Sequence, residues 1–337
     1  MTDPVLTPSL PALLQRFFVE HLTHHRAVSP RTIAAYRDTF RLLLGFAEAT
    51  IGKAPTAIAM TDLDAKLILA FLDHLEKDRK NAVRSRNTRL AALRSFLIYA
   101  AHHDLTALAV IEQALSIPMK RFERPMLGFL TREEMRAILD ALNATTWAGR
   151  RDRALFNVMY NTGARVSEAI GLRNRDIATA DGSAAVHLLG KGRKHRSVPL
   201  WKPTNTLLRD WVKRLSDTRP EAFLFPNRNG GRLTRSNVTQ RLALAVISAT
   251  AKQPGLAGRS ISPDTLRHTT AMHTLQSGVD ITVIALWLGH ESRATTHMYL
   301  EADLSMKERA LGRLQPIETA AARYRPPDQL MSFLQSL

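Results

Sequence analysis

The chain contains no cysteine among its 337 residues. This absence excludes disulfides, thiolate nucleophiles, cysteine-ligated zinc and iron–sulfur clusters. No apolar run approaches the roughly 18 residues of a membrane-spanning helix, and the N-terminus lacks the basic patch and apolar block of a signal peptide. We therefore expect a soluble cytoplasmic protein with no membrane partner, whose chemistry uses oxygen and nitrogen side chains.

Motifs of nucleotide and metal chemistry are also missing. Gly190 and Lys191 are followed by Gly192 and lack the upstream glycine of a P-loop. No HExxH motif or histidine cluster has metal-ligand spacing, and acidic residues are too sparse for an evident two-metal nuclease. The sequence therefore predicts neither a metal ion nor a cofactor.

Positive charge is what the chain has in excess. It carries 47 Lys and Arg against 30 Asp and Glu, a net charge of +17, which favours a polyanion as partner. Residues 1–120 hold +4 and residues 121–337 hold +13, while residues 300–337 carry five charges of each sign. The length predicts two domains of about 150 residues each. We expect the basic body to meet the polyanion and the neutral tail to meet protein.

The first third of the chain is predicted to be helical. Apolar residues recur every three or four positions near residues 10–22, 30–46, 65–80 and 86–102. Ser9 before the first segment, and Ser29 with Pro30 before the second, are typical helix starts. Thr61 and Asp64 resemble a capping box for the third. These apolar stripes are interpreted as core.

A basic run without any acid crosses the last two of these helices. It comprises Lys80, Arg84, Arg86, Arg89 and Arg94. A solvated helix face usually alternates in sign, so contact with phosphate is the sharper interpretation. An ordinary solvated face remains the alternative.

The second half of the chain is predicted to mix helices with a small sheet. A basic, Pro-containing segment, 109–128, is expected to link the two domains, and Thr131 with Glu134 then forms a capping box. Segments on either side of a Gly-Lys-Gly turn predict a β-hairpin over 184–189 and 193–200. Further helices are expected near 151–161, 165–172, 204–216, 236–250, 263–276, 281–288 and 293–300. The fold class is therefore mainly α with a small antiparallel β-sheet.

A scattered set of polar residues stands out in this half. Arg165 lies near a helix start, where exposed N–H groups also attract anions, and Glu168 can hold its guanidinium by a charge-assisted bond. Lys191 occupies the hairpin turn. Three more follow in order: Arg267, His290 and Tyr299. Each alone has a structural explanation, whereas the ordered set does not.

Four segments of this half resemble the tyrosine recombinase (phage integrase) family. They read TGARVSEAIGL at 162–172, GKGRKHRSVPL at 190–200, TLRH at 265–268 and LWLGH at 286–290, the last leading to Tyr299. The N-terminal helical block, with SPRT at 29–32, is similar to the family's core-binding domain. The resemblance implies a SAM-like DNA-binding domain over 9–108, a mixed α/β catalytic domain over 129–300 and a tail over 301–337. The two domains would form a C-shaped clamp on double-stranded DNA.

The resemblance also implies a site-specific recombinase that cuts and rejoins DNA through a 3′-phosphotyrosyl link without metal or ATP. Tyr299 is then the nucleophile, Arg165 and Arg267 grip the phosphate, Lys191 protonates the leaving 5′ oxygen and His290 hydrogen-bonds the phosphate. Two guanidinium forks suit two non-bridging oxygens, and a phenol of pKa about 10 must lose its proton as it attacks. The expected DNA-binding residues are Arg31, Lys80, Arg84, Arg86, Arg89, Arg94, Arg193, Lys194 and Arg196.

One position departs from the family's pattern, because the usual His-x-x-Arg is replaced by Asp264 followed by Arg267. An ionised Asp only accepts hydrogen bonds, and its charge repels phosphate unless Arg267 or His268 offsets it. Asp264 is the base that helps to deprotonate Tyr299, a group that orients Arg267, or the mark of a slow or partner-dependent enzyme. A structural acid at a helix start is the fourth interpretation.

The tail ends in a short predicted helix after Pro326 and Pro327. Its apolar stripe is Leu330, Phe333, Leu334 and Leu337, and so short a helix needs a surface, either on its own domain or on a neighbouring protomer. The resemblance implies a homo-oligomer on nucleoid DNA, a tetrameric synapse in which sister recombinases can take part. The alternatives are an accessory DNA-binding protein with impaired catalysis, a type IB topoisomerase-like relaxase, and a transcriptional regulator, which would leave the motifs unexplained.

Overall fold

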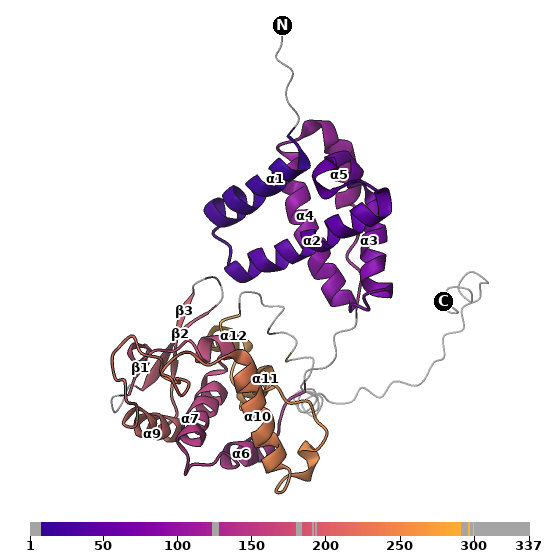
Figure 1. Cartoon of the computed structure of the whole chain (residues 1–337). Helices are drawn as coiled ribbons and strands as arrows, with labels where there is room; N and C mark the ends of the chain where they lie inside the picture. Colours follow the sequence, from indigo (N-terminus) through magenta and orange to yellow (C-terminus); the bar gives the residue numbers. More distant parts are fainter. Residues whose placement is uncertain are drawn as a thin grey trace, which may run out of the picture. The chain divides into compact units, whose positions relative to one another are not determined.

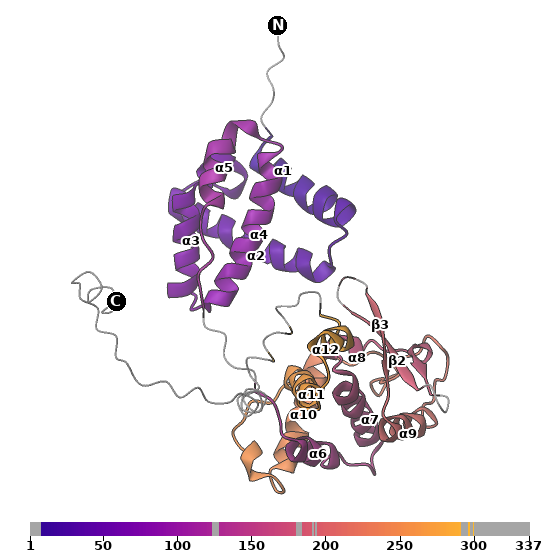
Figure 2. The same cartoon turned by 180° about the vertical axis from the view of Figure 1, so that it is seen from behind.

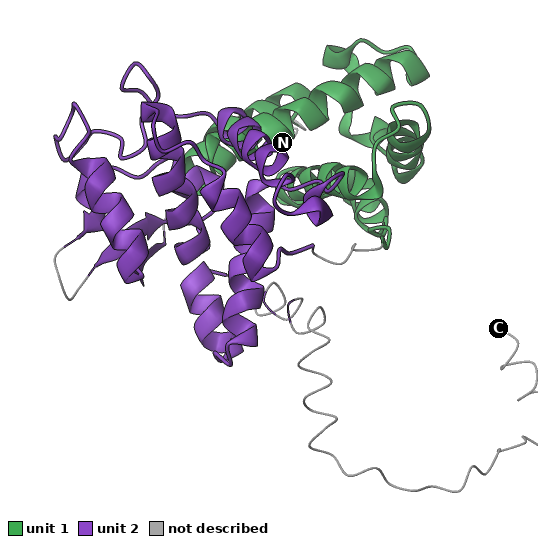
Figure 3. Cartoon of the chain, turned by 90° about the horizontal axis from the view of Figure 1, so that it is seen from below, with its two compact units in different colours: residues 1–124 green, residues 125–337 purple. Residues whose placement is uncertain are grey.

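The computed structural model describes residues 8–122, 128–179, 184–190, 192, 194–290, 296 and 299. The chain divides into two compact units, residues 1–124 and 125–337 (Figure 3). The boundary falls inside the segment 109–128 that was expected to be a linker. Within the described ranges, no helix is long and apolar enough to span a bilayer.

The N-terminal unit is built from helices alone within its described residues (Figure 1). Ser9 and Ser29 cap α1 and α2 through their side chains, as predicted, with a proline in the first turn of each helix. The first predicted helix continues beyond α1 as a π-helix, η1. The elements are α1 Leu10–Arg16, η1 Phe17–His25, α2 Pro30–Ile51, η2 Pro55–Ala57, η3 Met60–Asp62, α3 Ala65–Lys77, α4 Val83–Ala101, η4 Leu105–Ala107 and α5 Leu108–Leu115.

Packed aromatic rings fill the centre of this unit. Phe17, Phe40 and Phe96 contact one another edge to face, with ring centroids 5.2–6.5 Å apart. Such arrangements match the positive edge of one ring with the negative face of another. The apolar stripes of the sequence are therefore core, as interpreted.

Two details of the N-terminal prediction were wrong. The third helix is capped by Asp64 itself, whose carboxylate accepts from the Leu67 amide at 2.7 Å, and Thr61 lies in η3 instead. The expected linker begins with α5, which has Ile111 and Ala114 buried in the unit's core. Burial of this apolar face explains why residues 108–115 form a helix.

The C-terminal unit combines helices with a three-stranded antiparallel sheet, as predicted. Helix α7 lies between α9 and α11 (Figures 1 and 2). The hairpin strands β2 and β3 pair with Val186 opposite Val198, and a short strand that was not predicted, β1, pairs with β2. The elements are α6 Arg132–Asp140, α7 Trp147–Thr162, α8 Val166–Ala169, η5 Asn174–Asp176, β1 Ile177–Ala178, β2 Ala185–Leu189, β3 His195–Pro199, α9 Lys202–Val212, α10 Arg235–Ala249, η7 Pro254–Leu256, α11 Pro263–Gln276 and α12 Ile281–Leu288.

Several local predictions for this unit are confirmed. Thr131 and Glu134 form the capping box of α6, and α11 and α12 have the predicted bounds. Of the helix expected over 293–300, the structure describes Thr296 and Tyr299, both in helical conformation. The predicted tail, residues 301–337, lies outside the described residues.

Candidate active site

Four of the predicted catalytic residues come from four separate segments of the C-terminal unit. Arg165 is the N-cap of α8, Arg267 lies on α11, His290 follows α12, and Tyr299 lies further along the chain. Arg267 joins two of these segments, since its guanidinium donates to the Gly163 carbonyl at 2.6 Å and to the Leu288 carbonyl at 2.7 Å. The structure thus brings together the loop before Arg165 and the end of the helix before His290.

Two glycines make this close approach possible. Gly163 has φ +60°, and a Cβ there would lie 2.3 Å from Cδ2 of Leu288. Gly289 ends α12 with φ +64°, in the left-handed region that favours glycine. Each glycine comes just before a catalytic candidate, so these local sequences position the side chains that follow.

A buried carboxylate holds Arg165. Glu168 accepts from the Arg165 guanidinium at 3.1 Å and from the Arg165 amide at 2.9 Å, which confirms the predicted pairing. Its other partner is Arg196, whose Nη2 lies 2.7 Å from Glu168 Oε2. Burial alone would raise the pKa of Glu168, but the hydrogen bond and charge of Arg196, together with the hydrogen bonds from Arg165, lower it overall.

Arg196 was expected to contact DNA, and the structure corrects this expectation. Its side chain is only 10% exposed, and besides Glu168 it donates to the Trp287 carbonyl at 3.0 Å. Arg196 therefore connects strand β3 to α8 and to the end of α12. It stabilises the site through these contacts instead of presenting its charge at the surface.

Burial lowers the pKa of two side chains in this site, Arg267 and His290. Burial, and then the charge of Arg165, lowers the pKa of Arg267 to about 10, so that Arg267 is still a cation at neutral pH. Burial, followed by the charges of Arg267 and Arg165, lowers the pKa of His290 to about 4, which leaves this imidazole neutral. His290 Nδ1 lies 2.7 Å from the Thr296 hydroxyl, and Thr296 is a partner that the sequence did not reveal.

Tyr299 is buried against two histidines. Tyr299 is only 1% exposed, and its ring stacks on that of His290 with an interplanar angle of 15°. Its hydroxyl lies 3.0 Å from His268 Nδ1. Burial raises the pKa of Tyr299, and the charges of Arg267 and Arg165 oppose this shift. His268, expected only to offset the charge of Asp264, is therefore the direct partner of the phenol.

Asp264 is exposed in the first turn of α11. Within the described part of the chain it makes no hydrogen bond, and the Arg267 guanidinium that it was thought to orient is held by two main-chain carbonyls instead. Its charge nevertheless acts on the site, because it raises the pKa of both His268 and Tyr299. The orienting interpretation is thus wrong.

The expected DNA-binding residues divide by exposure. Arg86 is only 3% exposed: its guanidinium donates to the Pro118 carbonyl and faces Glu76, so we no longer expect it to contact phosphate. Arg94 is half-buried and donates to the Leu115 carbonyl at 2.7 Å, and Arg89 is also half-buried. Exposed at the surface are Arg31, Lys80, Arg84 and Lys194. Lys191 and Arg193, at the hairpin turn, lie outside the described residues.

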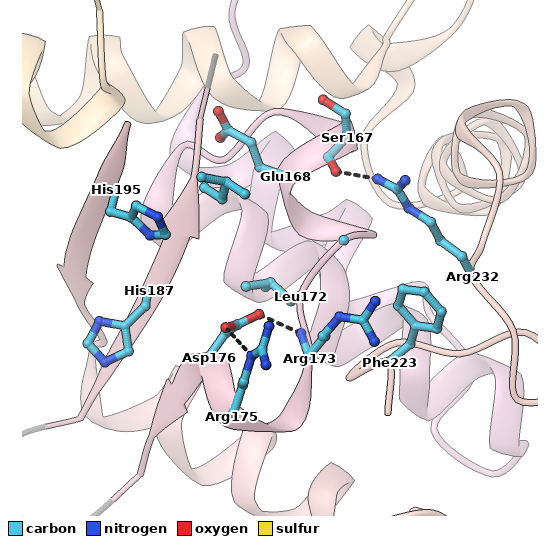
Figure 4. Close-up of a pocket in the computed structure, with 12 residues that line it drawn as sticks. Ser167, Glu168, Leu172, Arg173, Arg175, Asp176, His187, His195, Phe223 and Arg232 are labelled. Atoms are coloured by element: carbon cyan, nitrogen blue, oxygen red, sulfur yellow. Dashed lines mark hydrogen bonds and ion pairs between the residues drawn. The ribbon is translucent and has the colours of Figure 1, made fainter. Parts of the chain in front are cut away.

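A pocket that the sequence did not reveal, lined by three arginines, two histidines and the carboxylates of Glu168 and Asp176, adjoins α8 (Figure 4). Ser167 and Glu168 line it on the α8 side, so the carboxylate that holds Arg165 also borders this pocket. Arg232 donates to the Ser167 carbonyl at 2.8 Å, and Arg173 lies over the Phe223 ring at 4.8 Å. The basic lining residues are Arg173, Arg175, His187, His195 and Arg232. They are scattered between residues 173 and 232, and no spacing in the sequence marks them as one group.

Two guanidiniums, a neutral imidazole and a tyrosine hydroxyl are the groups needed to hold a phosphodiester and to attack it. Guanidinium forks match phosphate oxygens, and a phenol can form a covalent intermediate when a neighbouring base takes its proton. The fold and the site together define an enzyme of phosphoryl transfer that uses tyrosine as its nucleophile.

Comparison with known proteins gives the same class of enzyme. The profile of the phage integrase family matches residues 128–306, and that of the phage integrase N-terminal SAM-like domain matches residues 15–104. The chain is 46% identical over 329 residues to y4rC of Sinorhizobium fredii, named as a candidate integrase/recombinase, covering 98% of each chain. It is 33% identical to tyrosine recombinase XerC of Pelobacter propionicus over 291 residues, covering 86% of this chain and 90% of the other.

A solved structure supports the fold. The XerH site-specific recombinase bound to its palindromic difH substrate superposes with a TM-score of 0.66 at 20% identity, covering 86% of this chain and 81% of that one. The chain belongs to the phage integrase family, the tyrosine recombinases. Members of this family are enzymes that transfer DNA strands.

Proposed function

We propose that this enzyme cleaves and rejoins double-stranded DNA at a specific site through a 3′-phosphotyrosyl link to Tyr299. The observation that supports this most directly is the pair of hydrogen bonds from Arg267 to the Gly163 and Leu288 carbonyls. They hold the segments of Arg165 and His290 together near the Tyr299 phenol.

The groups have complementary roles in the proposed reaction. Arg165 and Arg267 hold the non-bridging oxygens, and Arg267 has three N–H donors left after the two carbonyl bonds, counted among the described residues. His290 has Nδ1 on Thr296, and its Nε2, which has no hydrogen-bond partner among the described residues, would face the phosphate. Pre-set donors of this kind stabilise charge that develops on the phosphate oxygens during attack. Lys191 is the proposed acid for the leaving 5′ oxygen, as the family resemblance implies.

The partner and the assembly follow from charge and from the relatives. Double-stranded DNA suits a chain of charge +17, with the exposed cations on both units and the pocket beside α8 contacting phosphates. We propose that the two units clamp the DNA, that the enzyme works as a homo-oligomer in a tetrameric synapse in the cytoplasm, and that sister recombinases can join it. The predicted helix after Pro327 would dock on a neighbouring protomer, so deletion of residues 326–337 should weaken assembly on DNA.

A covalent adduct tests the proposal. Full-length protein would be incubated with a pool of randomised duplexes, nicked so that cleavage releases a short fragment and traps the enzyme on the DNA. We expect an SDS-resistant adduct that is absent with Tyr299→Phe, and enrichment of one sequence among the trapped duplexes. Binding without any adduct would indicate an accessory protein, and adducts with no sequence preference, together with relaxation of arbitrary plasmids, would indicate a topoisomerase-like relaxase.

A further inference from the structure

Helix α11 carries two histidines that each contact a tyrosine hydroxyl, that of the buried Tyr299 and that of the partly buried Tyr160. His268 Nδ1 lies 3.0 Å from the Tyr299 hydroxyl, and His273 Nδ1 lies 2.8 Å from the Tyr160 hydroxyl. In both pairs burial lowers the pKa of the histidine and raises that of the tyrosine. The pairs differ in their surroundings, because only the first lies beside Arg165, Arg267 and His290.

We propose that His268 is a further catalytic residue, the general base that takes the proton of Tyr299 during cleavage, with Asp264 acting through it. The proposal deepens the function proposed above and rests on it. It replaces the idea that Asp264 itself deprotonates the phenol, since the hydroxyl lies within hydrogen-bond reach of His268 and Asp264 makes no hydrogen bond among the described residues.

Cleavage forms one bond to phosphorus and breaks another. The Tyr299 oxygen forms a bond to phosphorus while its proton moves to His268 Nδ1, and the bond from phosphorus to the 5′ oxygen breaks. That oxygen leaves with a proton from the general acid. In rejoining, the 5′ hydroxyl attacks the phosphotyrosine and gives its proton back to the general acid, the bond from phosphorus to the Tyr299 oxygen breaks, and the imidazolium returns its proton to the departing phenol oxygen. Each cycle therefore leaves His268 as it began.

The pKa values of Tyr299 and His268 require the phenol proton to move to His268 while the Tyr299 oxygen attacks phosphorus. A phenol with a raised pKa does not ionise measurably on its own near neutral pH, and a histidine with a lowered pKa is present as the neutral base. As the oxygen bonds to phosphorus, its proton becomes far more acidic, so a neutral imidazole suffices as acceptor.

The charged groups around His268 fit this role. On its own helix Asp264, four residues earlier, raises the pKa of His268, whereas Arg267 lowers it. From the other segments, Tyr299 contacts it and His290 is close enough for the two imidazoles to affect one another. A carboxylate one turn away stabilises an imidazolium as it forms, which gives Asp264 a function in place of the family's histidine.

The test compares His268→Asn with His273→Asn. Asparagine places an amide near the position of Nδ1 and keeps a hydrogen bond to the tyrosine, but it cannot accept a proton. We expect single-turnover cleavage of the trapped duplex to fall by about 10²–10⁴-fold in His268→Asn, the range of general-base effects, and to change by less than about threefold in His273→Asn. Thermal unfolding followed by tryptophan fluorescence checks that both variants are folded.

Two readouts separate a base from a residue that only positions Tyr299. The wild-type rate should fall as pH drops through the pKa of His268, and His268→Asn should lose this acid limb. A substrate with sulfur in place of the bridging 5′ oxygen needs no general acid, so it should leave the His268→Asn defect in place.

Three results would overturn the proposal: wild-type cleavage by His268→Asn, a slow His268→Asn that keeps the acid limb, or rescue of His268→Asn by the sulfur substrate. Failure of the wild type itself to form an adduct would instead overturn the proposed function.

Discussion

Replacement of Arg196 by methionine is the sharpest test of how the site is held together. The Arg196 guanidinium donates to Glu168 Oε2 at 2.7 Å and to the Trp287 carbonyl at 3.0 Å, and the two side chains of the ion pair are 10% and 4% exposed. Methionine fills a similar volume but removes both donors. Among the described residues, Arg165 is then the remaining partner of the buried carboxylate.

The expected cost follows from what remains. Breaking a buried ion pair by removing one partner costs about 3–5 kcal/mol. Glu168 keeps the amide and guanidinium of Arg165, at 2.9 and 3.1 Å, so the carboxylate is not left without partners. We therefore expect the free energy of unfolding of the C-terminal unit to fall by about 3 kcal/mol, near the lower end of that range.

Tryptophan fluorescence during urea unfolding measures this unit alone. All four tryptophans, Trp147, Trp201, Trp211 and Trp287, lie in residues 125–337, so the N-terminal unit does not contribute to the signal. Arg219→Met is the matched control, because Arg219 and Asp217 form an ion pair of the same length, 2.7 Å, with side chains 82% and 39% exposed. The control should leave the urea midpoint unchanged, because exposed pairs contribute little.

Activity should fall together with stability. Without Arg196, the Arg165 guanidinium is the one cation left on Glu168 among the described residues and is drawn toward it, away from the proposed position of the phosphate. Misplacement of this kind can reduce cleavage about 10²-fold. A loss of less than about 1 kcal/mol in Arg196→Met, or a double mutant with Glu168→Gln whose cost is the plain sum of the two single costs, would refute the reasoning.

Three further predictions concern charge. Because the folded state lowers the pKa of His290 to about 4 from 6.5, the unfolded chain binds more protons between these two pH values. The free energy of unfolding of the C-terminal unit should therefore fall as pH drops from 6.5 toward 4, with a shallower slope in His290→Asn. Equal slopes in the two proteins would contradict the lowered pKa of His290. Arg86→Met should destabilise the N-terminal unit, as measured by circular dichroism. Arg84→Met should leave stability unchanged and reduce the salt dependence of DNA affinity by about one phosphate contact. The reverse pattern would contradict the burial of Arg86 and the exposure of Arg84. Asp264→Asn should shift the acid limb of cleavage to lower pH, because Asp264 raises the pKa of His268, and a shift to higher pH would exclude that coupling.

Local signals predicted much of this fold. Caps at Ser9, Ser29 and Thr131 and the Gly-Lys-Gly turn depend on neighbouring residues, and the structure confirms the helix starts and the hairpin they indicated. Helix α5 was missed because its burial depends on helices that are distant in the sequence. Periodicity cannot show which short apolar stretch will find such a surface.

The same distinction applies to the site. The family resemblance named Arg165, Arg267, His290 and Tyr299, but it could not show what holds them. Arg86 and Arg196 look like surface cations in the sequence, and only tertiary contacts with Glu76 and Glu168 show that they are buried partners. His268 is likewise one residue from Arg267 in the sequence, and the fold alone turns it toward the phenol.

The two carbonyl bonds of Arg267 affect how an inactive form of this enzyme should be chosen. Arg267→Lys or Arg267→Ala would remove a proposed phosphate ligand and, in the same step, release Gly163 and Leu288, which precede Arg165 and His290. Loss of activity in such a variant could not be divided between chemistry and assembly. Tyr299→Phe removes a single oxygen from a ring that stays packed on His290, so it is the variant to use wherever a DNA-bound but uncleaved complex is required.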